Sequence, residues 1–169
     1  MIVMLPIRGE DRYDIMKWRN EQIFHLRQDV KLTKQMQNSY FKDNILPSFD
    51  EEHPTQILFS ILKDKRCIGY GGLVHIDWIN QNAEISFLMD TQLEKAFFEA
   101  YWESFLTLLN LVAFDDLGLN KIYVYSFDIR PLLYKVLENQ NFEEEACLRN
   151  HKKVNNNFID VRIHSKFRL

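Results

Sequence analysis

The sequence predicts an α/β fold in which the strands of a sheet alternate with helices that pack on it. The first observation is the segment Cys67–Asp90, which has two apolar runs folded back at Trp78–Gln81. Asn80 and Gln81 tolerate turn conformations, so the two runs are expected to form antiparallel strands. The second observation is a long helical pattern, roughly Leu93–Leu117, that follows this hairpin directly. Its apolar residues recur at steps of three and four, which predicts a helix with one broad buried face.

The residues before the hairpin predict a short strand, a run of helices and a second strand. Pro6 places the first strand at a sheet edge or marks its end, because proline has no N–H for the ladder. Asp11 is positioned to cap the helix that follows. The expected elements are strand Ile2–Ile7, helices Arg12–Asn20, Gln22–Asp29 and Lys34–Asn44, loop Asn44–Pro54, and strand Gln56–Leu62.

The residues after the hairpin predict one more strand and helix and then a closing pair of strands. Gly118 is expected to end the long helix in a left-handed conformation. Pro131 suits the first turn of the next helix, where its missing N–H is not needed. The expected elements are strand Lys121–Phe127, helix Pro131–Asn139, and strands Phe142–Arg149 and Phe158–Phe167, which Val154–Asn157 joins.

Composition excludes several classes of protein. The chain has 169 residues, 46% hydrophobic and 14% aromatic, which excludes a disordered protein and suits one domain spanning residues 1–169. The net charge is −3 with both signs interspersed, so we expect no nucleic-acid surface. No apolar run is long enough to span a membrane, and the first residues lack a signal-peptide pattern. Cys67 and Cys147 suit buried free thiols in a reducing, cytoplasmic compartment.

Six short segments together carry a resemblance to a known family. They are WRNE at Trp18–Glu21, GYGGL at Gly69–Leu73, AEISFLMD at Ala83–Asp90, FDDLGLNKI at Phe114–Ile122, LYKVLENQNF at Leu133–Phe142 and FIDVRIHSKF at Phe158–Phe167. In this order and spacing they resemble the GNAT N-acetyltransferase superfamily over nearly the whole chain. The resemblance is closest to the branch that contains ribosomal-protein alanine acetyltransferases and nucleotide-amino-sugar acetyltransferases.

The resemblance implies a central mixed, mainly antiparallel sheet with a splay between its fourth and fifth strands. The fourth strand would be Glu84–Asp90 and the fifth Lys121–Phe127. It also implies acetyl-CoA as a co-substrate and no metal, with the pantetheine arm lying in the splay. There, unpaired backbone groups would bond the arm and stabilise an oxyanion. The residues expected to contribute them are Phe87, Leu88 and Met89.

The family's pyrophosphate loop departs from its usual pattern here. It normally contains glycines, which let backbone N–H groups approach phosphate, but residues 90–102 contain none. Glu94 has the wrong sign for binding phosphate. We expect the backbone amides of residues 93–98 to face the pyrophosphate, and the alternative is that cofactor binding is weakened or lost. The residues that match the loop loosely are Gln92, Lys95 and Ala96.

Acetyl transfer to an amine requires a base and an acid, and the resemblance implies candidates for both. Glu84 lies near the family's usual position for a base. If the hairpin turn is Ile79–Asn80, His75 faces Glu84 across the sheet and pairs with it. Both residues could instead have structural roles. Tyr134 is the expected acid for the departing thiolate, and the alternative is that it only packs against its neighbours.

The acceptor is less closely defined than the reaction. Trp18, Arg19 and Asn20 sit where this branch lines its acceptor pocket, although Trp18 could equally belong to the core. The sequence is similar to acetyltransferases of nucleotide-linked 4-amino sugars, which work in bacterial surface-glycan assembly. A protein or peptide amino terminus is the next acceptor, and a GNAT-shaped binding module without activity is the alternative from another class. Such domains often pair through exposed strands or helices, so a homodimer is a further expectation.

Overall fold

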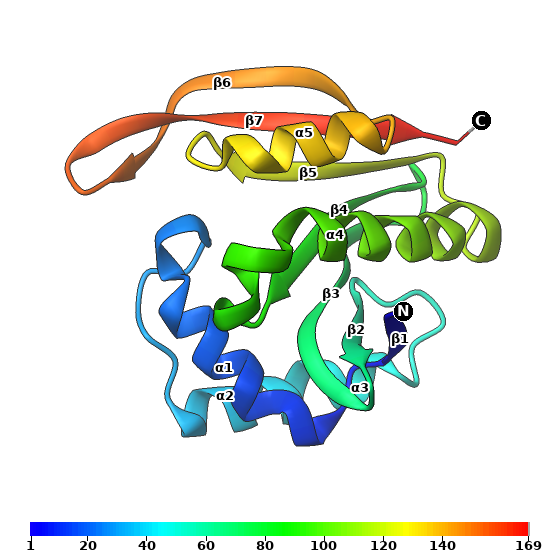
Figure 1. Ribbon diagram of the computed structural model, residues 1–169. Coiled ribbons are helices and arrows are strands. Elements are labelled where there is room, and N and C mark those ends of the chain that lie inside the picture. The colour runs from blue at the N-terminus through cyan, green and yellow to red at the C-terminus, as the bar shows by residue number, and fades with distance from the viewer. Residues whose placement is uncertain (169) are drawn as a thin grey trace.

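The computed structural model describes residues 1–168, and in these residues seven strands form one sheet (Figure 1). The strand order is β1-β2-β3-β4-β5-β7-β6, and each neighbouring pair is antiparallel except β4 and β5, which are parallel. The predicted α/β fold with a mixed, mainly antiparallel sheet is therefore confirmed. The strands are β1 (Val3–Pro6), β2 (Ile57–Lys63), β3 (Arg66–Asp77), β4 (Asn82–Met89), β5 (Lys121–Phe127), β6 (Glu143–Val154) and β7 (Asn157–Phe167).

Helices cover both faces of this sheet. The side chains of β4 show the division: Phe87 packs in a core with α4 and α5, whereas the adjacent Leu88 packs in a second core with α1. None of the helices in residues 1–168 is long and apolar enough to cross a membrane. The helices and helical turns are η1 (Gly9–Asp11), α1 (Arg12–Glu21), η2 (Ile23–His25), α2 (Lys34–Tyr40), η3 (Phe41–Ile45), α3 (Leu46–Ser48), α4 (Thr91–Asn110), η4 (Leu111–Asp116) and α5 (Pro131–Asn139).

The larger core explains the aromatic stripe on α4. Phe105 is fully buried, stacks on Phe87 of β4 with ring centroids 4.3 Å apart, and meets Trp102 edge to face. Such pairs add about 0.5–1.5 kcal/mol each beyond the area they bury. Gly118, which follows η4, has φ 66°, as predicted for the left-handed residue that ends the helix.

The strands β4 and β5 separate soon after they meet. They pair over only three residues each, from Asn82 with Lys121 to Glu84 with Tyr123. β4 continues to pair with β3 as far as Met89, and β5 continues to pair with β7 as far as Phe127. The predicted splay between the fourth and fifth strands is therefore confirmed. Residues 85–89 of β4 have a strand partner on one side only.

The register predicted for the β3–β4 hairpin is wrong by one residue. Val74, not His75, lies opposite Glu84, and Asp77 lies opposite Asn82. Two residues of β3 thus stand against one of β4, which is a β-bulge, and His75 in the bulge has φ 51°. The turn holds four residues rather than two, because Asp77 accepts hydrogen bonds from the Asn80 backbone and side chain and holds a longer loop closed.

Three other element boundaries differ from expectation. The helix expected over residues 22–29 is only the turn η2, because the Gln22 side chain is buried and donates hydrogen bonds to the Met89 carbonyl oxygen and the Thr91 hydroxyl. The helix expected to end at Asn44 continues through η3 and α3 to Ser48. Strands β6 and β7 extend to a two-residue turn at Asn155 and Asn156, both with positive φ.

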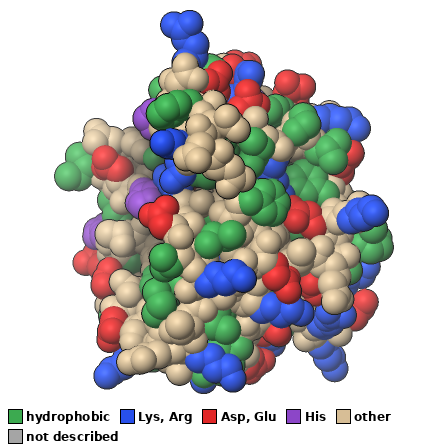
Figure 2. Space-filling model, turned by 90° about the vertical axis from the view of Figure 1, so that its left-hand side faces the viewer, with side chains coloured by type: hydrophobic (Ala, Val, Ile, Leu, Met, Phe, Trp, Pro, Cys, Tyr) green, Lys and Arg blue, Asp and Glu red, His purple; other side chains and the backbone are tan. Residues whose placement is uncertain are grey.

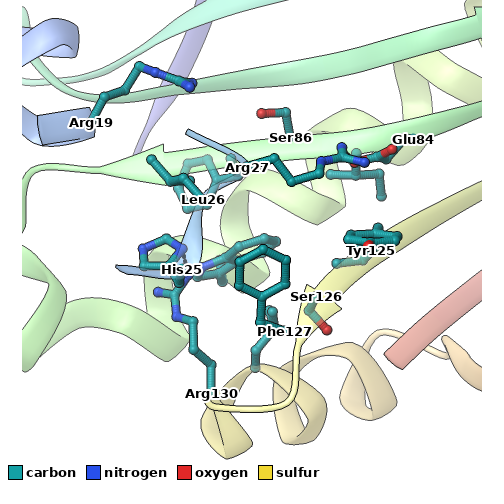
Figure 3. A pocket seen from close by; sticks show the side chains of 15 residues that line it. Arg19, His25, Leu26, Arg27, Glu84, Ser86, Tyr125, Ser126, Phe127 and Arg130 are labelled. Atoms are coloured by element: carbon teal, nitrogen blue, oxygen red, sulfur yellow. Dashed lines mark hydrogen bonds and ion pairs between the residues drawn. The ribbon is translucent and has the colours of Figure 1, made fainter. Parts of the chain in front are cut away.

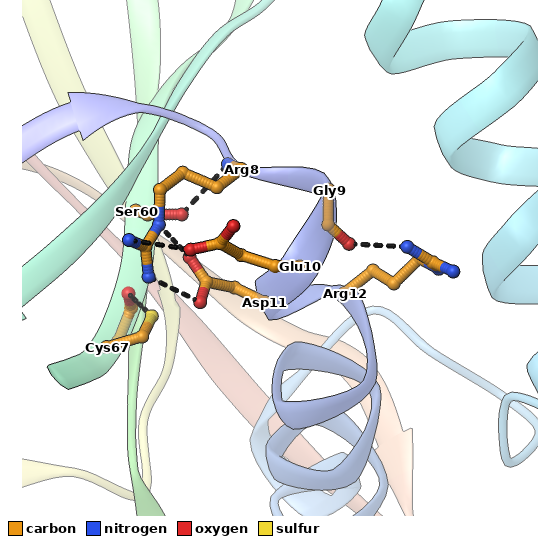
Figure 4. Close-up of polar contacts among 8 residues, drawn as sticks. Arg8, Gly9, Glu10, Asp11, Arg12, Ser60 and Cys67 are labelled. Atoms are coloured by element: carbon orange, nitrogen blue, oxygen red, sulfur yellow. Dashed lines mark hydrogen bonds and ion pairs between the residues drawn. The ribbon is translucent and has the colours of Figure 1, made fainter.

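A partly buried ion pair anchors the amino-terminal segment to the sheet (Figure 4). The Arg8 guanidinium donates to both carboxylate oxygens of Asp11 at 2.7 and 2.8 Å, and the Arg8 amide donates to the Ser60 hydroxyl at 3.0 Å. Burial opposes ionisation of Asp11, but the hydrogen bonds from Arg8 and Ser60 hold the pKa of that carboxyl below its ordinary value. This contact fixes the start of α1, the helix that carries Arg19.

The cysteines differ from each other. Cys67 is buried beside this ion pair, and burial raises the pKa of its thiol to about 12, so the thiol stays protonated. Cys147 is exposed, which corrects the expectation that both thiols are buried.

Lys and Arg side chains are interspersed with Asp and Glu on the face shown in Figure 2, in keeping with the small net charge.

Candidate active site

A cavity of about 230 Å³ lies in the splay between β4 and β5 (Figure 3). We call it the splay cavity. Because the pairing of β4 with β5 ends at Glu84, backbone groups on the β5-facing edge of residues 85–88 are available to a ligand. The residues that line the cavity are Arg19, His25, Leu26, Arg27, Glu84, Ile85, Ser86, Phe87, Trp102, Val124, Tyr125, Ser126, Phe127, Arg130 and Leu133.

A second cavity of about 350 Å³ adjoins the first and lies between the sheet and helices α1 and α2. We call it the α1–α2 cavity. Arg19 and Ser86 line both cavities, so the two meet at these side chains. The residues that line it are Ile7, Ile15, Arg19, Leu32, Met36, Gln37, Tyr40, Phe41, Leu58, Tyr70, Val74 and Ser86.

Of the three residues expected to bind the acceptor, the structure brings only Arg19 to a cavity. Its guanidinium donates to the Tyr70 hydroxyl at 2.5 Å and to the Gln28 side chain at 2.9 Å. Trp18 is 3% exposed and belongs to the core under α1. Asn20 bonds the Leu32 carbonyl oxygen and amide, and so fastens the segment before α2. The substrate role of Arg19 stays a prediction, as do those of Trp18 and Asn20, which lie outside the cavity lining.

Glu84 lies in the splay cavity, whereas His75 lies outside its lining. Glu84 is 5% exposed and its carboxylate accepts a hydrogen bond from Arg27, whose guanidinium carbon is 4.6 Å from the centroid of the Tyr125 ring. His75 Nε2 is 3.9 Å from Glu84 Oε2, and the His75 side chain is 66% exposed. The bulge therefore keeps the two side chains near each other despite the shifted register. This geometry suits Glu84 better than His75 for contact with a substrate.

Tyr134 also lies outside the lining of the splay cavity. Its hydroxyl donates to Asp128 Oδ1 at 2.8 Å, and its ring stacks on His164 with centroids 5.0 Å apart. Burial and the Asp128 carboxylate raise the pKa of Tyr134 above its ordinary value. The hydroxyl therefore holds its proton more tightly than a free phenol. Its role as the acid stays a prediction.

The start of α4 differs from the phosphate cradle that we expected. The Asp90 carboxylate caps the helix by accepting from the Gln92 amide at 3.0 Å, and the Asp90 carbonyl accepts from the Leu93 and Glu94 amides. Amides of residues 95–98 lie within the helix, where they bond to carbonyls four residues earlier. The expectation that the amides of residues 93–98 face the pyrophosphate is therefore wrong. The side chains of Gln92, Lys95 and Ala96 are exposed, and their contribution stays a prediction.

The three residues expected to contact pantetheine lie in different surroundings, because successive side chains of β4 point to opposite faces of the sheet. Phe87 lines the splay cavity, whereas Leu88 packs under α1 and the Met89 carbonyl oxygen accepts a hydrogen bond from Gln22. The cavity and the unpaired edge of β4 fit an extended chain that carries amide groups. The amides of Gln92, Leu93 and Glu94 are already bonded to Asp90 and are not free for a diphosphate. The splay cavity therefore fits the pantetheine arm of acetyl-CoA. The diphosphate must be bound by a group other than the amides at the start of α4.

A hydrogen-bonded network that sequence reasoning missed crosses the open end of the splay. Arg130 forms an ion pair with Glu94, and its guanidinium also lies 3.2 Å from His25 Nδ1. Arginine only donates, so Nδ1 accepts and the proton of His25 is on Nε2, which donates to Gln22 Oε1 at 3.1 Å. Gln22 then donates to the end of β4. The one feature of the sequence that pointed to this network was Glu94, because its negative charge does not suit phosphate binding.

This network predicts a pH-dependent stability. Burial, aided by Arg130, lowers the pKa of His25 from 6.5 to about 3, so the unfolded chain binds a proton that the folded protein does not. The contribution of neutral His25 to the free energy of unfolding is therefore fully present above pH 6.5 and is lost as the pH falls toward 3. Between pH 7 and 5 we expect His25 to account for a loss of about 2 kcal/mol in the free energy of unfolding. Urea denaturation of the wild type and of His25→Gln checks this.

The His25→Gln variant should lack that part of the decline, because glutamine does not titrate. His53→Gln, which replaces an exposed histidine in a loop, is the control and should behave like the wild type. Equal declines in wild type and His25→Gln would refute the network as described.

No group of three or more His, Cys, Asp and Glu side chains in residues 1–168 is arranged to hold a metal ion. The site consists of two adjoining cavities, a buried carboxylate and two arginines. Arg19 stands where the cavities meet, and Arg130 stands at the open end of the splay.

Comparisons with known proteins identify the family and the fold. A family model described as "Acetyltransferase (GNAT) domain" matches residues 6–163. No curated protein matches the sequence. The solved spermidine N-acetyltransferase of Vibrio cholerae with CoA and spermine has a TM-score of 0.83 at 18% identity, covering 99% of this chain and 95% of that chain. A chimera of the same enzyme, SpeG, with hSSAT has a TM-score of 0.82 at 18% identity, covering 98% and 95%.

The dodecameric structure of the Vibrio cholerae enzyme is also similar, with a TM-score of 0.77 at 19% identity, covering 98% of this chain and 93% of that chain. At these identities the solved structures establish the fold alone. The family assignment comes from the domain match, which extends over nearly the whole chain. The protein therefore belongs to the GNAT acetyltransferase family and is an N-acetyltransferase that uses acetyl-CoA.

Proposed function

We propose that this protein transfers the acetyl group of acetyl-CoA to the primary amine of a nucleotide-linked 4-amino sugar. The observation that carries the proposal is the junction of the two cavities at Arg19 and Ser86. An acetyl donor in the splay cavity and an amine in the α1–α2 cavity would meet there. Holding the two reactants in contact supplies a large share of the rate of such a transfer.

The lining of the α1–α2 cavity favours this acceptor. Tyr40, Tyr70, Gln37 and Ser86 supply hydroxyl and amide groups among apolar side chains, as a sugar ring with hydroxyl groups requires. The one charged residue in the lining is Arg19, a cation that attracts the phosphates or hydroxyl groups of an acceptor.

The same lining argues against a polyamine. Spermidine, the substrate in the names of the structural relatives, carries several positive charges at neutral pH. A multiply charged cation requires carboxylates, and among residues 1–168 no Asp or Glu lines the α1–α2 cavity. Glu84 in the adjoining splay cavity is already paired with Arg27. The lining of this cavity therefore suits a neutral or anionic acceptor better than a polyamine.

The proposed chemistry assigns a role to each group at the junction. Acetyl-CoA supplies an activated thioester. Glu84 would take the proton of the attacking amine, directly or through a water, because it lies in the splay cavity two residues from Ser86 on the same face of β4. The N–H groups of residues 85–89 that face the splay rather than β3 would donate to the thioester oxygen as its charge grows. Tyr134 remains the candidate donor of a proton to the departing thiolate.

The test is an acceptor panel with free-thiol release as the readout. It contains a nucleotide-linked 4-amino sugar, spermidine and a peptide with an alanine amino terminus. We expect the amino sugar to have the highest kcat/KM. Higher kcat/KM with spermidine, or turnover of the peptide alone, would overturn the assignment of the acceptor without affecting the reaction.

Arg19→Gln should change the choice of acceptor. We expect kcat/KM for the amino sugar to fall by roughly ten- to a hundredfold, the range for losing a hydrogen bond to a charged group. The ratio of spermidine to amino-sugar activity should rise, because a cation has left the cavity. Lys17→Gln, on an exposed side chain of the same helix, is the matched control. An unchanged ratio of activities in Arg19→Gln would show that Arg19 does not read the acceptor.

A further inference from the structure

The ion pair between Glu94 and Arg130 spans the open end of the splay. β4 ends at Met89 and β5 at Phe127, and the two side chains follow these strand ends in α4 and just before α5. Parallel strands that separate are farthest apart at these ends, so a ligand lying along the splay must pass the ion pair. Figure 3 shows Arg130 reaching up beside His25 at this edge of the splay cavity.

Arg130 is a buried cation whose neutralisation depends on one carboxylate. Its side chain is 14% exposed, its guanidinium carbon is 4.9 Å from the centroid of the Phe98 ring, and His25 contributes only a neutral acceptor. In residues 1–168, Glu94 is the only carboxylate in ion-pair contact with it. Burial lowers the pKa of Arg130, and Glu94 acts in the opposite direction. A cation in this setting requires an anion at all times.

The usual anion site of such a splay is already filled from within the chain. The Asp90 side chain and carbonyl accept from the first amides of α4, and Arg66 donates to the same carboxylate at 2.9 Å. A diphosphate arriving at this helix start would meet a second anion instead of free donors. Another cation must therefore receive it, and Arg130 is the buried cation at the same opening.

We propose that Arg130 binds the diphosphate of acetyl-CoA, and that Glu94 occupies the same guanidinium until the cofactor displaces it. This inference rests on the proposed function. The exchange replaces one anion by another, so the buried charge of Arg130 is neutralised in both states. The planar guanidinium suits both partners, because it donates in pairs to carboxylate or phosphate oxygens. A thioester without phosphate cannot make the exchange, so the ion pair would also select for the complete cofactor.

The experiment compares the binding of CoA and of pantetheine, which lacks the diphosphate, by isothermal titration calorimetry. Arg130→Gln should weaken CoA by roughly ten- to a hundredfold, since a hydrogen-bonded charge is lost. Glu94→Gln should tighten CoA by roughly three- to tenfold, because the competing carboxylate is gone. Pantetheine should bind all variants within about twofold of the wild type, since no phosphate is involved.

Two further comparisons separate this inference from general effects. Glu99 of α4 and Lys135 of α5 form an exposed pair at 3.1 Å, so Glu99→Gln and Lys135→Gln are matched controls and should bind CoA like the wild type. The double variant Glu94→Gln/Arg130→Gln should bind CoA as weakly as Arg130→Gln, because the gain from Glu94→Gln requires Arg130. Misfolding cannot produce the gain in affinity, and thermal melting checks Arg130→Gln.

The outcomes distinguish the role of Arg130 from the proposed function. If the wild type binds CoA and either Arg130→Gln or Glu94→Gln binds it with unchanged affinity, the role of Arg130 is overturned and the proposed function stands. A tightening by Glu94→Gln that persists in the double variant would also overturn it. Wild type that binds neither CoA nor pantetheine would overturn both proposals.

Discussion

Glu84→Gln is expected to lower the turnover of acetyl transfer by roughly a hundred- to ten-thousandfold, the usual contribution of an acid–base group. The substitution keeps the size of the side chain and removes the group that would accept the amine proton. Glu84 is the buried carboxylate of the splay cavity, so no other Asp or Glu in its lining can replace it. Single-turnover measurement of acetyl transfer, with acetyl-CoA and acceptor saturating, separates this step from product release.

The loss must be distinguished from a rearrangement around Arg27, which would lose its carboxylate partner. The double variant Glu84→Gln/Arg27→Gln removes that unpaired charge and should remain as inactive as Glu84→Gln. Glu99→Gln removes a carboxylate from the exposed part of α4 and serves as the control for charge. A loss smaller than threefold in Glu84→Gln would show that Glu84 is not the base.

Gly72→Ala is expected to lower the free energy of unfolding more than any other substitution described above. Gly72 has φ 154°, and an added Cβ would lie within hard contact of the Ile57 carbonyl oxygen and 3.0 Å from Leu58 Cα. These are backbone atoms of β2, so the strand itself must move. Overpacking and backbone strain together should cost about 3 kcal/mol or more. We expect the melting temperature to fall by roughly 6–12 °C in a protein of this size.

Gly9→Ala is the matched control for this substitution. A Cβ at Gly9 would meet only the end of the Arg12 side chain, at 4.0 Å, so its melting temperature should stay near that of the wild type. The comparison also explains why the GYGGL segment contains glycines, since β2 and β4 pass too close to β3 for side chains there. Equal melting temperatures for Gly72→Ala and the wild type would refute this account of the strand contact.

The sequence predicted elements whose signals are local. The bounds predicted for β5 and α5, Lys121–Phe127 and Pro131–Asn139, are those of the structure, because a strand of aromatic and branched residues and a proline at a helix start are read within one element. The end of the long helix at Gly118 followed from the need for positive φ. The resemblance of six segments then predicted the splay, which the short β4–β5 pairing confirms.

Positions that depend on an added residue or on a distant partner could not be predicted in this way. The bulge at His75 shifted the hairpin register, because one extra residue changes every pairing beyond it. The helix expected after α1 gave way to a turn, because the Gln22 side chain bonds the end of β4, which is 67 residues away in the chain.

The residues of the candidate site also fall into these two groups, those indicated by the sequence and those that depend on distant partners. The sequence by itself pointed to Glu84, Phe87 and Arg19 through the family pattern, and these three residues line the cavities. Only the tertiary structure brought His25 to Arg130, 105 residues later in the chain, and set Glu94 against that arginine. Charges are read from the sequence, but the pairing of buried charges is decided by which helix ends the folded sheet brings together.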